Sequence, residues 1–120
     1  MPVRLLSSSV MKWPDAQTVH RAMEQWAKET AEASPEVVAI GYFGSYARGD
    51  WGVGSDVDIV IVVRSSQEPP LRRPLQFNTL SLPVPADVMV YTLDEWQKID
   101  PSSRFGKVLQ NEVKMGFSAH

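Results

Sequence analysis

The sequence predicts an α/β fold of the α+β kind, with a small mixed β-sheet and helices packed mainly on one of its faces. Three features predict it: an apolar stripe at helical spacing near the N-terminus, three later apolar runs of strand length, and a Gly-Ser turn between the first two runs. With 120 residues, 43% hydrophobic and 22% charged, the chain has the size and composition of one globular domain. We assign residues 1–12 to a flexible N-terminal arm and residues 13–117 to a single domain.

The composition excludes several functional classes. A net charge of −2 argues against strong nucleic-acid binding, which normally needs a basic surface. The chain has no cysteine, which excludes disulfides and thiolate-bound zinc and favours a cytoplasmic location. Its apolar runs are of strand length, so we expect neither a membrane span nor a membrane partner. Carboxylate and metal chemistry remain open, whereas the two histidines, His20 and His120, make histidine-centred catalysis a poor hypothesis.

The region after the arm predicts an amphipathic helix. Pro14 suits a first helical turn, and Asp15 lies near the positive end of the helix dipole. Apolar and small residues then recur at three- and four-residue steps, at Val19, Ala22, Met23, Trp26, Ala27 and Thr30. Ser34-Pro35 ends the pattern. We expect the stripe to be buried, and His20 beside it to be a solvated or capped side chain rather than a ligand.

The rest of the chain predicts strands first and helices last. Strand-length apolar runs occupy residues 36–43, 56–63 and 86–91. Prolines exclude a regular element from residue 64 to residue 74, and residues 75–82 fit either a short strand or an irregular edge. Two final helices are expected at residues 93–99 and about 102–113, with Asp94 and Ser102 as caps.

Three carboxylates mark the ends of predicted strands. Asp56 and Asp58 are alternate residues at the start of the second strand, so their side chains point to the same side of the sheet. Asp87 opens the third strand. Carboxylates so placed can hold divalent ions that bind a triphosphate, and two such ions can clamp both the attacking and the leaving oxygen. Asp87 is also a candidate general base. Alternatively, these acids only begin strands beside turns.

The turn before the second strand suggests the phosphate side of the same site. Gly44 lets the backbone approach a ligand closely, and the Ser45 hydroxyl and the amides of a short helix over residues 45–49 favour an anion. We also expect Ser45 to be the N-cap of that helix. Arg48 either reaches the phosphates or ties the short helix to an acid such as Asp50.

These motifs resemble those of the minimal nucleotidyltransferases in the DNA polymerase β superfamily. That family has a Gly-Ser turn, often extended to Ala-Arg-Gly, then Ser-Asp-x-Asp, then one acid on a later strand. The chain carries Gly44-Ser45-Tyr46-Ala47-Arg48-Gly49, Ser55-Asp56-Val57-Asp58 and Asp87. The resemblance covers residues 40–91 by motif and implies the DNA polymerase β-like nucleotidyltransferase fold.

The resemblance also implies an activity and a partner. It implies transfer of a nucleoside monophosphate, AMP from ATP, to a hydroxyl, with two Mg²⁺ ions, or Mn²⁺, held by Asp56, Asp58 and Asp87, and with Gly44, Ser45 and Arg48 at the nucleotide. Proteins of this size resemble antitoxins encoded beside a HEPN-domain toxin, whose tyrosine they adenylylate. We therefore expect a HEPN-domain protein as partner.

Two other functions fit the sequence. One is a binding module that neutralises a partner by contact alone, without catalysis. The other is a nucleotidyltransferase acting on a small molecule such as an aminoglycoside. If a partner supplies the acceptor, Tyr46 and Trp51 are expected to be exposed aromatic side chains at the edge of the interface, although Trp51 can equally be buried against its own sheet or stack on a base.

Overall fold

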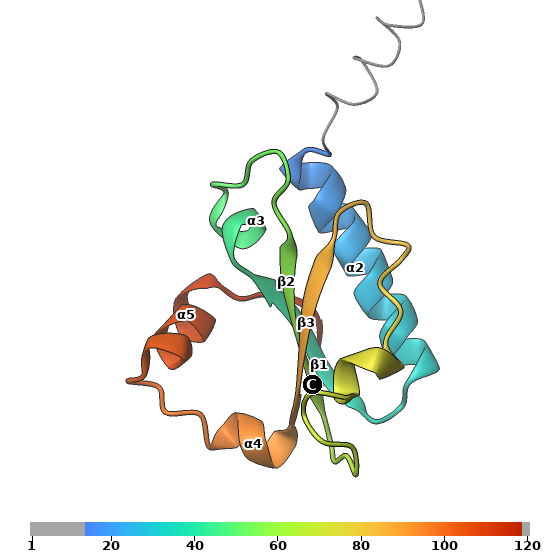
Figure 1. Ribbon diagram of the computed structural model, residues 1–120, viewed down its shortest axis with the longest axis vertical. Coiled ribbons are helices and arrows are strands. Elements are labelled where there is room, and N and C mark those ends of the chain that lie inside the picture. The colour runs from blue at the N-terminus through green and yellow to red at the C-terminus, as the bar shows by residue number, and fades with distance from the viewer. Residues whose placement is uncertain (1–13, 119–120) are drawn as a thin grey trace, which may run out of the picture.

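A four-stranded mixed sheet organises the computed structural model, which describes residues 14–118 (Figure 1). Its strands, in the spatial order β3-β2-β1-β4, are β1 (Val37–Phe43), β2 (Val57–Val63), β3 (Ala86–Thr92) and β4 (Lys114–Ser118). β1 is antiparallel to both β2 and β4, whereas β2 and β3 are parallel. The mixed sheet and its first three strands are therefore as predicted. The N-terminal arm assigned to residues 1–12 lies outside the described residues.

The fourth strand was not predicted. Lys114–Ser118 is short and largely exposed, so it lacks the alternation that marks a half-buried strand. Two glycines let it fit between β1 and the long helix. A Cβ on Gly41 would lie 2.8 Å from Val113 Cγ1, and one on Gly116 would lie 2.9 Å from Ala27 Cβ. The residues that follow the last predicted helix, to which no element was assigned, therefore form a strand that completes the sheet.

The long helix α2 (Ala16–Ala33) covers one face of the sheet, as Figure 1 shows. Asp15 is its N-cap and accepts a hydrogen bond from the Thr18 amide at 2.8 Å, while Ser34 is its C-cap. Its buried residues are Val19, Met23, Trp26 and Ala27, which pack on alternate residues of β1 and β2. The predicted end and buried stripe of this helix are confirmed, whereas Pro14, expected in the first turn, precedes the Asp15 N-cap. Within residues 14–118, no helix is long and apolar enough to cross a bilayer.

His20 is not a solvated side chain. It is half-buried, and its Nδ1 shares a hydrogen bond with the hydroxyl of Tyr42 on β1. Burial lowers the pKa of His20 and raises the pKa of Tyr42 to about 12. The pair is therefore neutral at pH 7 and links α2 to the sheet rather than serving as a ligand.

The short helices α4 (Leu93–Gln97) and α5 (Arg104–Glu112) lie on the face opposite α2 (Figure 1). Their apolar side chains form a second, smaller core around Phe43, Val60 and Leu109. The expectation that helices pack mainly on one face was therefore wrong: the 18-residue α2 covers one face, and these two shorter helices cover the other. β1 and β2 are consequently buried on both sides.

Both of these helices begin one or two residues away from the predicted caps. Thr92, rather than Asp94, is the N-cap of α4, because its hydroxyl accepts from the Glu95 amide while the Glu95 carboxylate accepts from the Thr92 amide. Ser103, rather than Ser102, caps α5 by accepting from the Gly106 amide at 3.0 Å. Neighbouring Asp, Ser and Thr residues are all suitable N-caps by sequence, and the tertiary fold decides which of them begins the helix.

The connection between β2 and β3 has no long helix, although parallel strands need a crossover. It crosses the α2 side of the sheet as turns and one 3₁₀ helix, η1 (Arg73–Gln76). Proline in the first turn of η1 is tolerated because no amide is needed there. Residues 75–82 are irregular rather than a strand, and the indole of Trp26 holds them by donating to the Asn78 carbonyl at 2.8 Å.

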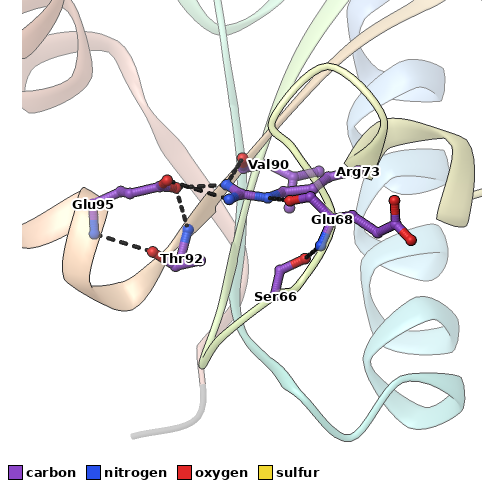
Figure 2. Close-up of polar contacts among 6 residues, drawn as sticks. All are labelled: Ser66, Glu68, Arg73, Val90, Thr92 and Glu95. Carbon is purple, nitrogen blue, oxygen red and sulfur yellow. Dashed lines mark hydrogen bonds and ion pairs between the residues drawn. The ribbon is translucent and has the colours of Figure 1, made fainter.

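Arg73 pins this connection to the edge of the sheet (Figure 2). Its side chain is 6% exposed. The guanidinium donates to the carbonyls of Glu68 and Val90 and makes a two-pronged ion pair with Glu95 at 2.6 and 3.2 Å. Arg73, with the Thr92 amide, lowers the pKa of Glu95 to about 2. One buried charge thus joins η1, β3 and α4.

We expect Glu95→Gln to weaken the fold by about 1.5 kcal/mol at pH 7, the lower end for a hydrogen bond to a charged group. The value is low because the Glu95 side chain is 39% exposed and the pair is partly screened. A depressed folded-state pKa gives stability above the unfolded value near 4.5 that is lost as the pH falls toward about 2. Urea unfolding from pH 7 to pH 2 should show this loss in the unsubstituted protein and not in Glu95→Gln.

The matched control is Asp94→Asn on the same helix. Asp94 pairs with Lys98 at 2.9 Å, but both side chains are more than 70% exposed (73% and 74%). Its loss should cost less than about 0.5 kcal/mol. Equal losses of unfolding free energy in the two variants would mean that the ion pair between Arg73 and Glu95 stabilises the fold no more than an exposed pair does.

Candidate active site

The sheet brings together the acids that the sequence singled out. Asp58 on β2 and Asp87 on β3 are direct partners in the parallel register. Val57 and Ile59 are fully buried on the α2 side, so Asp58 faces the opposite side. Asp56 immediately precedes β2, two residues before Asp58. Asp58 is half-buried, whereas Asp56 and Asp87 are exposed.

Asp58 is the electrostatic centre of this group. Its burial, followed by the charges of Asp87 and Asp56, raises its pKa above the ordinary value, and Arg48 opposes the shift. The carboxylates are therefore close enough to repel one another. A bound cation would relieve this repulsion.

These acids suit a divalent metal because carboxylate oxygens are the ligands it prefers, and not because they already surround a metal-sized site. Within residues 14–118, no three His, Asp or Glu side chains are arranged as a ready metal-binding group. Mg²⁺ commonly takes only one or two protein carboxylates and fills its other positions with water and phosphate oxygens. The cross-strand pair Asp58 and Asp87, with Asp56 beside it, suits that mode of binding. The metal roles of all three acids stay predictions.

Gly44 lies directly against the Asp58 carboxylate. Its φ is +84°, a conformation that side chains rarely adopt, and a Cβ there would overlap the Asp58 Oδ2 atom. Gly44, and not Ser45, is the N-cap of helix α3 (Ser45–Arg48), because the chain turns at the glycine and Ser45 is already helical. The turn and the central acid thus touch, as the order of the motifs suggested.

Arg48 is held by two carboxylates. It donates to Asp50 at 3.1 Å and to Glu112 at 3.0 Å, and these bonds raise its pKa. The tie to Asp50 was one of the two alternatives for Arg48, and its contact with phosphate stays a prediction. Glu112, at the end of α5, was not anticipated. It lies near enough to Asp58 to raise the pKa of that carboxyl. The sequence gives no signal for this role, because Glu112 is 64 residues away from Arg48 and belongs to none of the motifs.

The two aromatic residues expected at an interface are placed differently. Tyr46 is fully buried in the core, so the expectation that it lies exposed at the cleft was wrong. Its side chain points from the short helix α3 into the main core, which includes residues of α2, β1 and β2. Trp51 is half-buried and stacks on Tyr46, with ring centroids 5.5 Å apart and planes 12° apart. Of the alternatives for Trp51, burial within its own domain therefore holds for the ring face that contacts Tyr46.

We expect Gly44→Ala to be strongly destabilising, by about 2 kcal/mol or more, because backbone strain and overlap with Asp58 add together. Gly49→Ala separates the two causes, since Gly49 also has a positive φ, +90°, but nothing lies near its Cβ position. It should cost about 1 kcal/mol. Denaturant unfolding measures both values, and an equally mild loss in Gly44→Ala would show that Asp58 can move away at no cost.

Asp58→Asn should stabilise the metal-free protein at neutral pH, because it removes the charge that burial and two neighbouring acids disfavour. A gain of about 1 kcal/mol would raise the melting temperature by roughly 4 °C in a chain of this size. The same substitution should abolish most of the stabilisation that Mg²⁺ or Mn²⁺ gives. Glu32→Gln, on an exposed position of α2, controls for simple charge removal. A metal response that survives in Asp58→Asn would place the ion elsewhere.

Comparison with known proteins agrees with this fold. Residues 23–110 match the family model described as a nucleotidyltransferase domain, a span that contains every predicted site residue. A candidate nucleotidyltransferase from Sulfolobus solfataricus is similar in structure, with a TM-score of 0.60 and 19% identity over 91% of this chain and 93% of that one.

A second solved structure, described as a toxin–antitoxin with AMP-PNP, aligns with a TM-score of 0.49 and 17% identity over 81% of this chain and 74% of that one. The sequence has no match among curated proteins. The family match covers well over half of the residues, and the chain belongs to the nucleotidyltransferase domain family.

Proposed function

We propose that this protein transfers AMP from ATP to a hydroxyl with the help of bound Mg²⁺, or Mn²⁺. The observation that carries the proposal is the cross-strand pair of Asp58 and Asp87, with the side-chain-free Gly44 packed against Asp58. An acidic pair favours a metal, and the absence of a side chain at Gly44 lets the turn before α3 lie directly against the Asp58 carboxylate. Membership in the nucleotidyltransferase family supports the reaction type.

Each residue has a distinct role in this proposal. Asp56 and Asp58 hold the metal, which supplies charge neutralisation and alignment of the triphosphate. Gly44 and Ser45 contact the phosphates. Asp87, exposed on the edge strand β3, also binds metal and takes the proton of the acceptor hydroxyl. The acceptor oxygen forms a bond to the α-phosphorus, the bond from that phosphorus to the bridging oxygen breaks, and pyrophosphate leaves.

The ion pairs of Arg48 are compatible with two roles, which are to tie α3 to nearby acids and to contact the phosphates. Asp50 and Glu112 fix its position close to Asp58. We propose that the arginine, held in this way, contributes positive charge to the phosphate side of the site.

The acceptor is proposed to be a tyrosine on a partner protein, a HEPN-domain toxin, which this chain would silence as an antitoxin in the cytoplasm. The support for this part is the resemblance of the Gly44–Gly49 and Ser55–Asp58 motifs to those of minimal nucleotidyltransferases. The exposed position of Asp87 is compatible with an acceptor arriving from another molecule. Neutralisation by contact alone is the rival hypothesis.

Incubation with labelled ATP and Mg²⁺, with and without the protein encoded next to this one, tests the proposal. We expect an AMP adduct on the neighbouring protein, located by mass spectrometry. Asp87→Asn should lower the rate of transfer about 10²-fold or more, as for loss of a general base, while binding of the partner persists. Glu32→Gln serves as the control.

Two outcomes would contradict this proposal in different ways. Full neutralisation of the partner by Asp87→Asn in cells would favour the contact-only function. Labelling of an aminoglycoside instead of the neighbouring protein would favour the small-molecule function.

A further inference from the structure

A largely apolar pocket of about 420 Å³ lies beside Asp87, between the edge strand β3 and the connection from β2. Its walls include Pro70, Leu71, Pro74, Asp87, Met89 and Tyr91. None of these residues except Asp87 has a role in the function proposed above. Resting on that function, we propose that this pocket receives an apolar or aromatic group that carries the acceptor hydroxyl on a partner polypeptide.

The strand geometry places the pocket at the acceptor side of the site. Asp87, Met89 and Tyr91 alternate along β3, so their side chains share one face of the sheet. Successive members of this row are roughly 7 Å apart, about the length of one aromatic ring with its substituent. A ring seated against Met89 thus has its hydroxyl within reach of the Asp87 carboxylate. The residues proposed to hold the nucleotide lie on the other side of Asp87 from the pocket, since Asp58 is its partner on β2 and Gly44 lies against Asp58.

The contacts of the buried Arg73 side chain hold the pocket open without a ligand. The Arg73 guanidinium joins the carbonyl of Glu68 to the carbonyl of Val90 and the carboxylate of Glu95, as Figure 2 shows. These contacts fix the wall formed by residues 70–74 against β3. A fixed wall lowers the ordering cost of binding.

The surface around the pocket favours a protein over a sugar as the occupant. Leu71, Leu75 and Leu80 are 93%, 83% and 90% exposed, and all belong to the connection that forms the pocket wall. Exposed apolar groups gathered on one segment are typical of protein contact sites. A polyol would lose hydrogen bonds to water against walls of proline, leucine and methionine. An apolar side chain gains there instead.

Two leucines provide a matched pair of variants. Leu71 lines the pocket and Leu80 does not, yet both are about equally exposed on the same segment, so neither Leu71→Ser nor Leu80→Ser should disturb folding. The probe is p-cresol, a small molecule with an apolar ring and one hydroxyl, added to the ¹⁵N-labelled full chain. myo-Inositol, which has hydroxyls and no apolar ring, is the comparison ligand.

We expect p-cresol to shift the amide signals of Asp87 to Tyr91, with an affinity of about 1 mM, and myo-inositol to shift none of them. Leu71→Ser should weaken p-cresol binding about fivefold, as for the loss of roughly half of a buried leucine contact, and Leu80→Ser should leave it unchanged. No shifts at these amides, equal shifts with myo-inositol, or equal weakening in the two variants would each overturn the pocket assignment.

The transfer reaction supplies a second, separate readout. Leu71→Ser should raise the KM for the partner while kcat and the affinity for MgATP stay unchanged, a split that a folding defect would not give. A protein that binds p-cresol but transfers no AMP would overturn the proposed function. A protein that transfers AMP without binding p-cresol at β3 would overturn only the pocket.

Discussion

The parallel pairing of β2 with β3 is the constraint on which the rest of the structure depends. Its register sets Asp58 opposite Asp87, and a shift by one residue would turn one of the two carboxylates to the α2 side of the sheet. The buried side chains of Val57 and Ile59 on one face and Val60 on the other fix that register, because each must stay in its own core. The apolar packing of β2 therefore positions the polar site.

The same parallel pairing requires a crossover connection, and this connection forms one wall of the apolar pocket beside Asp87. A helix usually covers such a connection, but the prolines between β2 and β3 prevent one. The buried Arg73 takes over part of that task by saturating the Val90 carbonyl on the open edge of β3 and pairing with Glu95. A buried cation with full hydrogen bonding gives the wall one defined position, which apolar packing of an irregular segment would specify less well.

The elements that were predicted correctly are those that a pattern of neighbouring residues in the sequence identifies. The buried stripe of α2 and the three apolar strands need only nearby residues to be recognised. The missed features depend on residues far apart in the chain. β4 is a strand because Gly41 and Gly116 admit it, and Glu112 joins the site because α5 ends beside Arg48. Motif spacing likewise predicted that the acids would adjoin the Gly44 turn, but it gave no sign of the pocket wall.

The charge balance of the site has a consequence for the order of binding. The carboxylates of Asp56, Asp87 and Glu112 lie near Asp58 and raise its pKa. Within residues 14–118, Arg48 is the one cation that lowers the Asp58 pKa, and it is already paired with Asp50 and Glu112. A bare triphosphate would meet net negative charge and be repelled. A triphosphate that arrives with its divalent cation brings the charge that these carboxylates lack. For the proposed transfer reaction, the acidic surroundings of Asp58 would therefore favour the metal complex of the nucleotide over the free nucleotide.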